Sequence, residues 1–305
     1  MQLNFDITPR RTFLLLVTFI VFTLIGFAII SFRAPFTDES KLFTKSPNYV
    51  IWMVVMAVLT GLLPIFGLPL WRSLLLYYRD EWREHRLVII LSSIMLYILV
   101  MAPIPFVLIF TRLEFPLYGH ITKMVIIFTL TFFAILPAAI GLWLINPAAE
   151  KAYAGETGSS DSYYQFIESY KSFRSDLQLY LAIAGILISM VVLSTEALRN
   201  ALIDFQPANE DIFSASMAIV YGLYFALVLA LIYVPTFLQL QKLGRNFIDK
   251  IYPVKSLVEY GEKKDRRDQV EELLNLKIGV FANLRSGLFI LAPLVTSLFS
   301  SVIKF

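Results

Sequence analysis

Seven long runs of apolar residues limit what this chain can fold into. They cover residues 12–32, 49–71, 87–110, 121–145, 177–195, 212–240 and 286–303. A helix needs roughly 20 such residues to cross a membrane, and the first six runs carry no Asp, Glu, Lys or Arg in their interiors except Lys123 near one end. The seventh run is shorter. The expected fold is an all-α, polytopic membrane protein with seven transmembrane helices, or with six and a re-entrant C-terminal helix.

Composition supports the same class. The chain is 58% hydrophobic and 16% charged, whereas about a quarter of the residues of a soluble domain are charged. Cysteine is absent, which excludes disulfides, thiolate metal sites and cysteine nucleophiles. The first run is longer than the apolar core of a signal peptide, and no small-x-small cleavage site follows it. We therefore expect it to remain as a helix.

The basic residues predict the orientation. If the N-terminus is cytoplasmic, nineteen Lys and Arg residues fall in the segments on that side and six in the segments on the other. Short cytoplasmic segments are enriched in Lys and Arg. Together with the missing cysteines, this favours a bacterial inner membrane protein with its N-terminus inside.

The expected domain organisation has three parts. Residues 1–240 form a six-helix membrane domain, and an amphipathic cytoplasmic segment at 146–176 interrupts it. In that segment Tyr163, Phe166, Ile167, Tyr170 and Phe173 share one helical face, which suits the headgroup layer or a partner helix. Residues 241–285 form a basic, amphipathic cytoplasmic segment, and residues 286–305 form a C-terminal membrane helix.

The sixth run contains a strip of small residues spaced four apart, which places them on one helical face. The strip is Ser214, Ala218, Gly222, Ala226 and Ala230, and Gly185 with Ser189 makes a shorter strip in the fifth run. Small residues let two helices approach closely in lipid. The sequence leaves two alternatives for the longer strip: packing against the fifth run, or contact with another subunit.

Several apolar runs contain prolines, among them Pro64, Pro137, Pro235 and Pro293. Proline removes a backbone hydrogen bond and kinks a helix. These residues are candidate hinges, although spanning helices tolerate proline in general.

The spans lack the groups that ion coupling or catalysis uses. Ion-coupled transporters place ionisable residues inside the bilayer, and the six clear span interiors have none apart from Lys123. No metal, cofactor or catalytic motif is present, so we expect no cofactor, no metal and no nucleic-acid partner. Asp80, Glu81, Glu84 and His85 cluster in "YYRDEWREHR" and leave an enzyme as a minor alternative. We favour a solvated helix end whose arginines face anionic headgroups as the explanation of this cluster.

The C-terminal part combines a charged helix with a hydroxyl-rich one. Alternating charges from Glu259 to Glu272 predict an exposed helix with a basic surface at Lys263, Lys264, Arg266 and Arg267. In the last run, Ser297 and Ser300 either pack against another helix or face a path through the membrane.

Three functions remain open at this point. The first is a non-enzymatic protein that oligomerises into a pore, channel or membrane effector. The second is an uncoupled transporter of a neutral solute, and the third is an anchor or sensor that recruits a soluble partner through residues 255–277. The chain resembles small multi-span bacterial membrane proteins that act as effectors or channels, but only in architecture, and architecture does not fix function. The expected partners are the lipid bilayer with its anionic headgroups, a second copy of the chain, and a soluble cytoplasmic protein.

Overall fold

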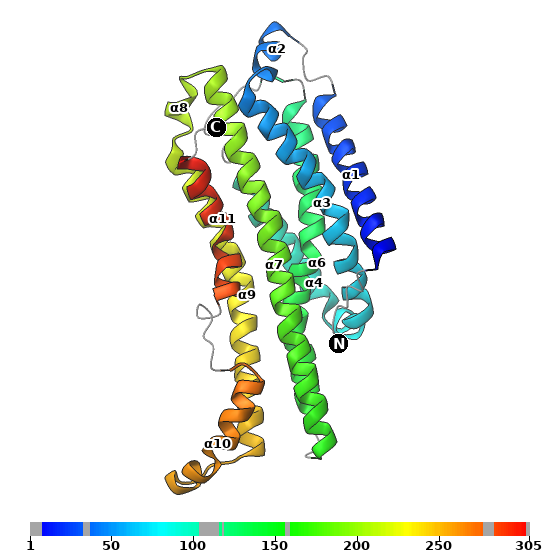
Figure 1. Cartoon of the computed structure of the whole chain (residues 1–305), viewed down its shortest axis with the longest axis vertical. Helices are drawn as coiled ribbons and strands as arrows, with labels where there is room; N and C mark the ends of the chain where they lie inside the picture. The colour runs from blue at the N-terminus through cyan, green and yellow to red at the C-terminus, as the bar shows by residue number, and fades with distance from the viewer. Residues whose placement is uncertain are drawn as a thin grey trace.

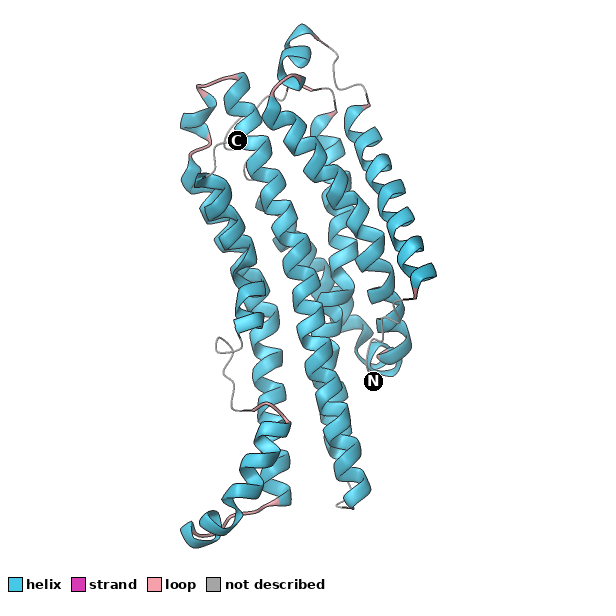
Figure 2. Cartoon of the chain, in the orientation of Figure 1, coloured by secondary structure: helices cyan, strands magenta, loops and turns pink. Residues whose placement is uncertain are grey.

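A computed structural model describes residues 8–32, 37–103, 116–117, 119–155, 159–276 and 284–302. Within these residues helices are joined by short turns and no strand is formed (Figure 2). The helices, in chain order, are α1 (Pro9–Ser31), α2 (Asp38–Thr44), α3 (Pro47–Tyr77), α4 (Arg79–Met101), α6 (His120–Ala154), α7 (Ser160–Phe205), α8 (Asn209–Ile212), α9 (Ala215–Ile251), α10 (Leu257–Leu273) and α11 (Leu284–Val302).

Six of these helices are long and apolar enough to cross a membrane: α1, α3, α4, α6, α7 and α9. Large apolar side chains cover their outer faces, as at Phe13, Leu87 and Met95, which are each about two-thirds exposed or more. A soluble protein rarely exposes apolar surface on this scale, whereas lipid solvates it. The chain is therefore a polytopic, all-helical membrane protein, as the apolar runs predict.

The long helices lie roughly side by side (Figure 1). Helices α3, α6 and α7 pack against one another at the centre, α1 packs on α3, and α4 lies outside α6. Helices α9 and α11 complete the other side of α7. We call the two ends of the bundle the α10 end and the α2 end, after the helices that lie there (Figure 1).

Helix α7 is much longer than a membrane is thick. Its 46 residues span about 69 Å at about 1.5 Å per residue, against about 30 Å of hydrocarbon. Asp176 and Glu196, at 8% and 3% exposure, flank the apolar run 177–195 and lie about 30 Å apart along the helix. Residues 160–176 of α7 therefore extend beyond the apolar layer, together with residues 241–251 of α9 and helix α10. We call these three segments the projection.

The C-terminal apolar run forms one helix, α11, which packs on both α7 and α9. It runs along α9 toward the α2 end (Figure 1). Its apolar part, Gly287–Phe299, is shorter than the apolar stretches of the six long helices.

Lys123, the one charged residue within the six clear runs, stabilises the end of α1. Its ammonium group donates to the carbonyl of Ile30 at 3.1 Å and to the carbonyl of Phe32. The last carbonyls of a helix have no partner within the helix, and a cation near them is favourable. This lysine therefore has a structural explanation.

Two prolines free carbonyl groups that a neighbouring helix then satisfies. Pro137 cannot donate to the carbonyl of Phe133 four residues earlier, and the indole N–H of Trp71 in α3 donates to that oxygen at 3.1 Å. In the same way Tyr224 Oη donates at 2.6 Å to the carbonyl of Leu99, which lies four residues before Pro103. In both cases the proline creates an interhelical hydrogen bond, which holds two helices together.

This pairing predicts a coupling between Trp71 and Pro137. We expect Trp71→Phe to lower the free energy of unfolding by about 1–3 kcal/mol, because it leaves a carbonyl unsatisfied. In a Pro137→Ala background the alanine N–H can bond to that carbonyl, so the same substitution should cost clearly less. Unfolding of the four proteins in mixed micelles measures the coupling. Equal costs in both backgrounds would show that the indole does not serve the carbonyl of Phe133.

Candidate functional site

The projection has its own aromatic core. The Phe166 ring of α7 lies 4.2 Å from the Phe247 ring of α9, centroid to centroid. Tyr163 lies 5.8 Å from Phe247, and Tyr153 of α6 lies 5.8 Å from Phe166. The aromatic face expected at 146–176 thus packs on helices of the same chain and not on headgroups. The projection is an ordered helical body joined to the bundle by α7 and α9.

Helix α10 folds back against the end of α9 and is held there by two of its basic residues. Arg267 donates to Asp249 at 2.5 Å and to the carbonyl of Tyr252 at 2.6 Å. The Lys263 ammonium donates to the carbonyl of Pro253 at 2.7 Å. The other two residues of the expected basic surface, Lys264 and Arg266, are exposed. The four basic residues therefore divide into two that hold the turn and two that face outward.

A buried arginine of α7 holds the other end of α10. The Arg174 guanidinium donates to the carbonyl of Asn275 at 2.9 Å and to that of Leu274 at 3.3 Å. It also lies 5.6 Å from the centre of the Phe237 ring of α9, within the range of a cation–π contact. Asn275 has a φ of 54°, the left-handed conformation that commonly ends a helix. One side chain thus joins α7, α9 and the end of α10.

The sequence analysis missed Arg174, although a signal was present. Position 174 lies four and eight residues after Tyr170 and Phe166, which places it on the aromatic face of the helix. A charged residue on an apolar face needs a partner when the face is buried. That signal shows that a partner exists, but not that the partner is the end of a helix 100 residues away.

Both small-residue strips face α11. A Cβ on Gly222 would lie 2.7 Å from Ser297 Cβ and 2.8 Å from the carbonyl oxygen of Pro293. A Cβ on Gly185 would lie 2.8 Å from the carbonyl oxygen of Phe289, which is the oxygen freed by Pro293 four residues later. The two alternatives for the longer strip did not include α11. Helix α11 occupies the groove between α7 and α9, with a glycine at each wall.

The other small residues of the two strips are buried to different degrees. Ala218 and Ala226 are buried, Ala230 and Ser189 are half-buried, and Ser214 is exposed at the start of α9. Ser297 is fully buried and donates to the carbonyl of Leu294 at 2.8 Å. The described contacts of Ser297 are those of helix packing, and the Ser300 side chain lies outside the described residues.

The four candidate hinge prolines occupy different surroundings. Pro137 and Pro293 are buried, Pro64 is half-buried and Pro235 is exposed. The carbonyls that Pro137 and Pro293 release lie against Trp71 and Gly185. Both of these prolines lie in tight helix contacts, whereas a hinge needs room to move.

The acidic and histidine cluster of "YYRDEWREHR" lies along the first turns of α4. Glu81 pairs with Lys151 of α6 at 3.6 Å, whereas Asp80 and Glu84 are exposed. Among the described residues, no group of three or more His, Asp and Glu side chains has a geometry that could hold a metal ion.

A buried carboxylate joins α7 to the junction of α3 and α4. Tyr78 Oη donates to Asp176 at 3.0 Å, and both side chains are buried. Asp176 escaped the sequence analysis because it lies one residue outside the predicted apolar run.

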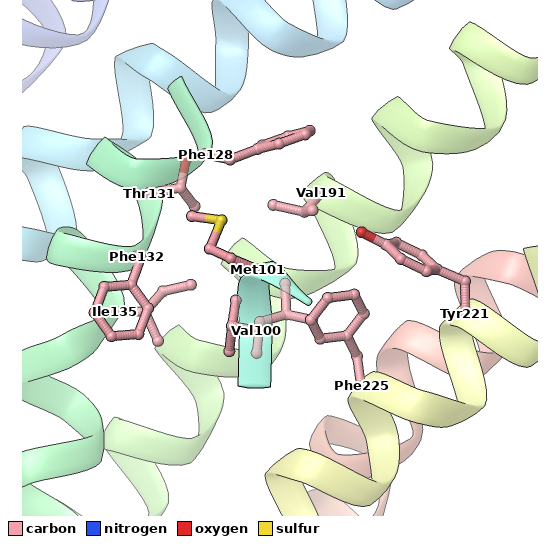
Figure 3. Close-up of a pocket in the computed structure, with 10 residues that line it drawn as sticks. Val100, Met101, Phe128, Thr131, Phe132, Ile135, Val191, Tyr221 and Phe225 are labelled. Atoms are coloured by element: carbon pink, nitrogen blue, oxygen red, sulfur yellow. The ribbon is translucent and has the colours of Figure 1, made fainter. Parts of the chain in front are cut away.

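A small cavity lies where α4, α6, α7 and α9 meet (Figure 3). Its volume is about 30 Å³, and its walls are almost entirely apolar. Thr131 and Tyr221 supply the hydroxyl groups of its lining, and Thr131 already donates to the carbonyl of Ile127 at 2.8 Å. Ligand pockets usually have volumes of about 300–1,000 Å³, so this cavity is a packing defect and not a solute site.

Comparison with protein-family models, with curated proteins and with solved structures gave no match for this chain.

Proposed function

We propose that this membrane protein is an anchor or sensor that recruits a soluble partner on the cytoplasmic side of a bacterial inner membrane. The projection is the recruiting element. The observation that carries this proposal is that α7 and α9 run from the bundle into the projection without a break. Arg174 then ties α10 to both of these helices. A partner bound to α10 would in this way act on helices that also form the membrane core.

The orientation belongs to the same proposal. Nineteen of the basic residues fall on one side when the apolar runs are threaded through a membrane, and the projection lies at that end of the bundle (Figure 1). The positive-inside rule then makes that end cytoplasmic. Exposed groups on α10 include Tyr260, the basic Lys264 and Arg266, and the acidic Glu262, Asp265 and Glu272. This mixed-charge surface with an aromatic side chain suits a soluble protein partner of complementary charge.

The pore and transporter hypotheses have less support. The pore hypothesis used the Gly222 strip as a subunit interface, and α11 of the same chain packs against Gly222 at the centre of that strip. A transporter needs a solute site inside the bundle, and the cavity described where α4, α6, α7 and α9 meet is about 30 Å³. The larger groove, of about 460 Å³, lies at the outside of the bundle between α1 and α3. Other surfaces remain for a subunit contact, since α1 and α4 are the least buried of the six long helices.

The proposal is tested with a photo-crosslinking amino acid placed at position 260 of α10 in cells. We expect a crosslink to one soluble protein, and we expect Lys264→Glu with Arg266→Glu to reduce its yield at least about tenfold, because two charges of the interface are reversed. The matched control is Lys41→Glu with Lys45→Glu, two exposed lysines at the α2 end, which should leave the crosslink unchanged.

Two results would overturn the recruiting function. One is a crosslink to a second copy of the chain only. The other is spontaneous ion flux through the purified protein in liposomes without any partner, which would return the pore to first place. Deletion of residues 255–277 is a poorer test, because it leaves the buried Arg174 without its carbonyl partners and destabilises the projection for that reason alone.

A further inference from the structure

A groove between α1 and α3 is open toward the α10 end of the bundle. Its volume is about 460 Å³, within the range of small-molecule sites. The floor and walls are mostly apolar, and Leu14, Leu15, Ile65 and Leu68 contribute to them. Two arginines, Arg11 and Arg72, also line it.

The positions of the glycines in α1 and α3 explain why the two helices touch at one end and leave a groove at the other. A Cβ on Gly26 would lie 2.7 Å from Thr60 Cβ, and one on Gly61 would lie 3.0 Å from the Phe19 ring. Helices α1 and α3 therefore touch closely near the α2 end. Gly67, the next glycine of α3, faces Ala134 of α6 instead, at 3.2 Å. Beyond it, Leu68, Pro69 and Arg72 of α3 line the space that remains open between the two helices.

The two arginines stand at the boundary of the apolar layer. Arg11 precedes the apolar run of α1 by one residue, and Arg72 follows directly after the run of α3 at Trp71. Because the two helices run in opposite directions, both side chains come to the same end of the groove. No acidic side chain lines the groove among the described residues. The groove is thus apolar within the membrane and basic at the headgroup layer.

We propose that this groove binds one anionic phospholipid of the surrounding bilayer. An acyl chain lies between α1 and α3, and the phosphate of the headgroup is held by Arg11 and Arg72. Guanidinium groups bind phosphate oxygens in a forked geometry, and basic pockets between membrane helices hold anionic headgroups elsewhere. A zwitterionic lipid fits the apolar part equally but places an ammonium group near the two arginines, so the site selects for net negative charge.

The test is native mass spectrometry of the purified full-length protein with added phosphatidylglycerol or phosphatidylethanolamine. We expect one phosphatidylglycerol to bind more tightly than phosphatidylethanolamine. Arg11→Gln with Arg72→Gln should weaken that binding on the order of thirtyfold, from the loss of two arginines at the headgroup layer. The matched control is Arg83→Gln with Arg86→Gln, two exposed arginines of α4 outside the groove, which should bind lipid as the natural protein does.

A second variant separates the groove from a general basic surface. Thr18→Trp fills the apolar part and leaves both arginines in place, and it should also weaken phosphatidylglycerol binding. Binding that survives Thr18→Trp, or that falls equally in the α4 control, would overturn the proposal. So would equal binding of the two lipids by the natural protein. None of these results depends on whether the projection recruits a soluble partner.

Discussion

Replacing Gly222 with leucine is expected to displace α11 from the groove between α7 and α9. The first added atom alone would lie 2.8 Å from the carbonyl oxygen of Pro293 and 2.7 Å from Ser297 Cβ. Backbone cannot move aside as the end of a flexible side chain can, so the cost belongs at the upper end of overpacking, about 3 kcal/mol. Gly185→Leu should act in the same direction, because its Cβ would meet the carbonyl of Phe289.

The absence of cysteine makes the displacement directly measurable. Ile290 of α11 is 3% exposed, so Ile290→Cys should react slowly with a small maleimide in the otherwise natural protein. It should react at least about tenfold faster when Gly222→Leu is added, since each 1.4 kcal/mol of opening free energy changes the accessible population tenfold. Leu288→Cys, which is already exposed, serves as the reference and should react equally in both backgrounds.

Gly261 supplies a matched control for the glycine itself. It lies on α10 with no atom within 4 Å of an added Cβ, so Gly261→Leu should leave both α11 and the unfolding temperature almost unchanged. If Gly222→Leu instead alters the number of subunits while Ile290→Cys stays protected, the strip serves an interface between copies and not the contact with α11. That outcome would restore the pore hypothesis.

The sequence predicts the class and the spans well because lipid imposes a simple rule on side chains. Each apolar run corresponds to one long helix of the structure or to α11. Residue 32 of the first run and residues 212–214 of the sixth lie outside α1 and α9, and some residues of the third and last runs lie outside the described range. The rule says little about where a helix ends. Helix α7 begins 17 residues before its apolar run. In this part of the helix, Phe166 packs against α6 and α9, and Tyr170 packs against α9. The apolar face of this part of α7 is covered by other helices of the chain and not by lipid.

Helix partners were harder to predict than helices. Glycines such as Gly185 and Gly222 indicate that another helix comes close, but the sequence of the strip does not tell which helix that is. The partner of both is α11, a helix that begins 62 residues beyond Gly222 in the chain. The burial of polar groups was harder still to predict from the sequence. Asp176 and Glu196 lie just outside the fifth run, where charged residues normally mark the end of a spanning helix and contact water.

The candidate site was predicted in part. The charge pattern places an amphipathic helix at α10 and identifies its basic residues, but it treats Lys263 and Arg267 as equivalent to Lys264 and Arg266. The turn at Tyr252 and Pro253 distinguishes the two pairs of basic residues, because it brings backbone carbonyl groups within reach of Lys263 and Arg267. Such a turn depends on contacts between α9 and α10, which no local pattern encodes.

Replacing Arg174 with methionine is expected to release α10 from the projection while the membrane bundle stays folded. Methionine keeps an aliphatic stem that packs beside Phe237, but it removes the donors to the carbonyls of Leu274 and Asn275. Hydrogen bonds from a charged donor contribute about 1.5–3 kcal/mol. We expect a local loss of about 3 kcal/mol, because those two bonds and the cation–π contact disappear together.

Amide hydrogen exchange resolves this local effect from global unfolding. Amides of α10 should exchange roughly a hundredfold faster in Arg174→Met, whereas those of α3 and α6 should be unchanged. Arg266→Met removes an exposed arginine from α10 itself and should leave exchange in α10 as it is. Faster exchange throughout the bundle would mean that Arg174 supports the whole fold. Unchanged exchange in α10 would mean that its end is held without the arginine, and Arg174 would then not be the side chain through which a partner on α10 acts on the membrane helices.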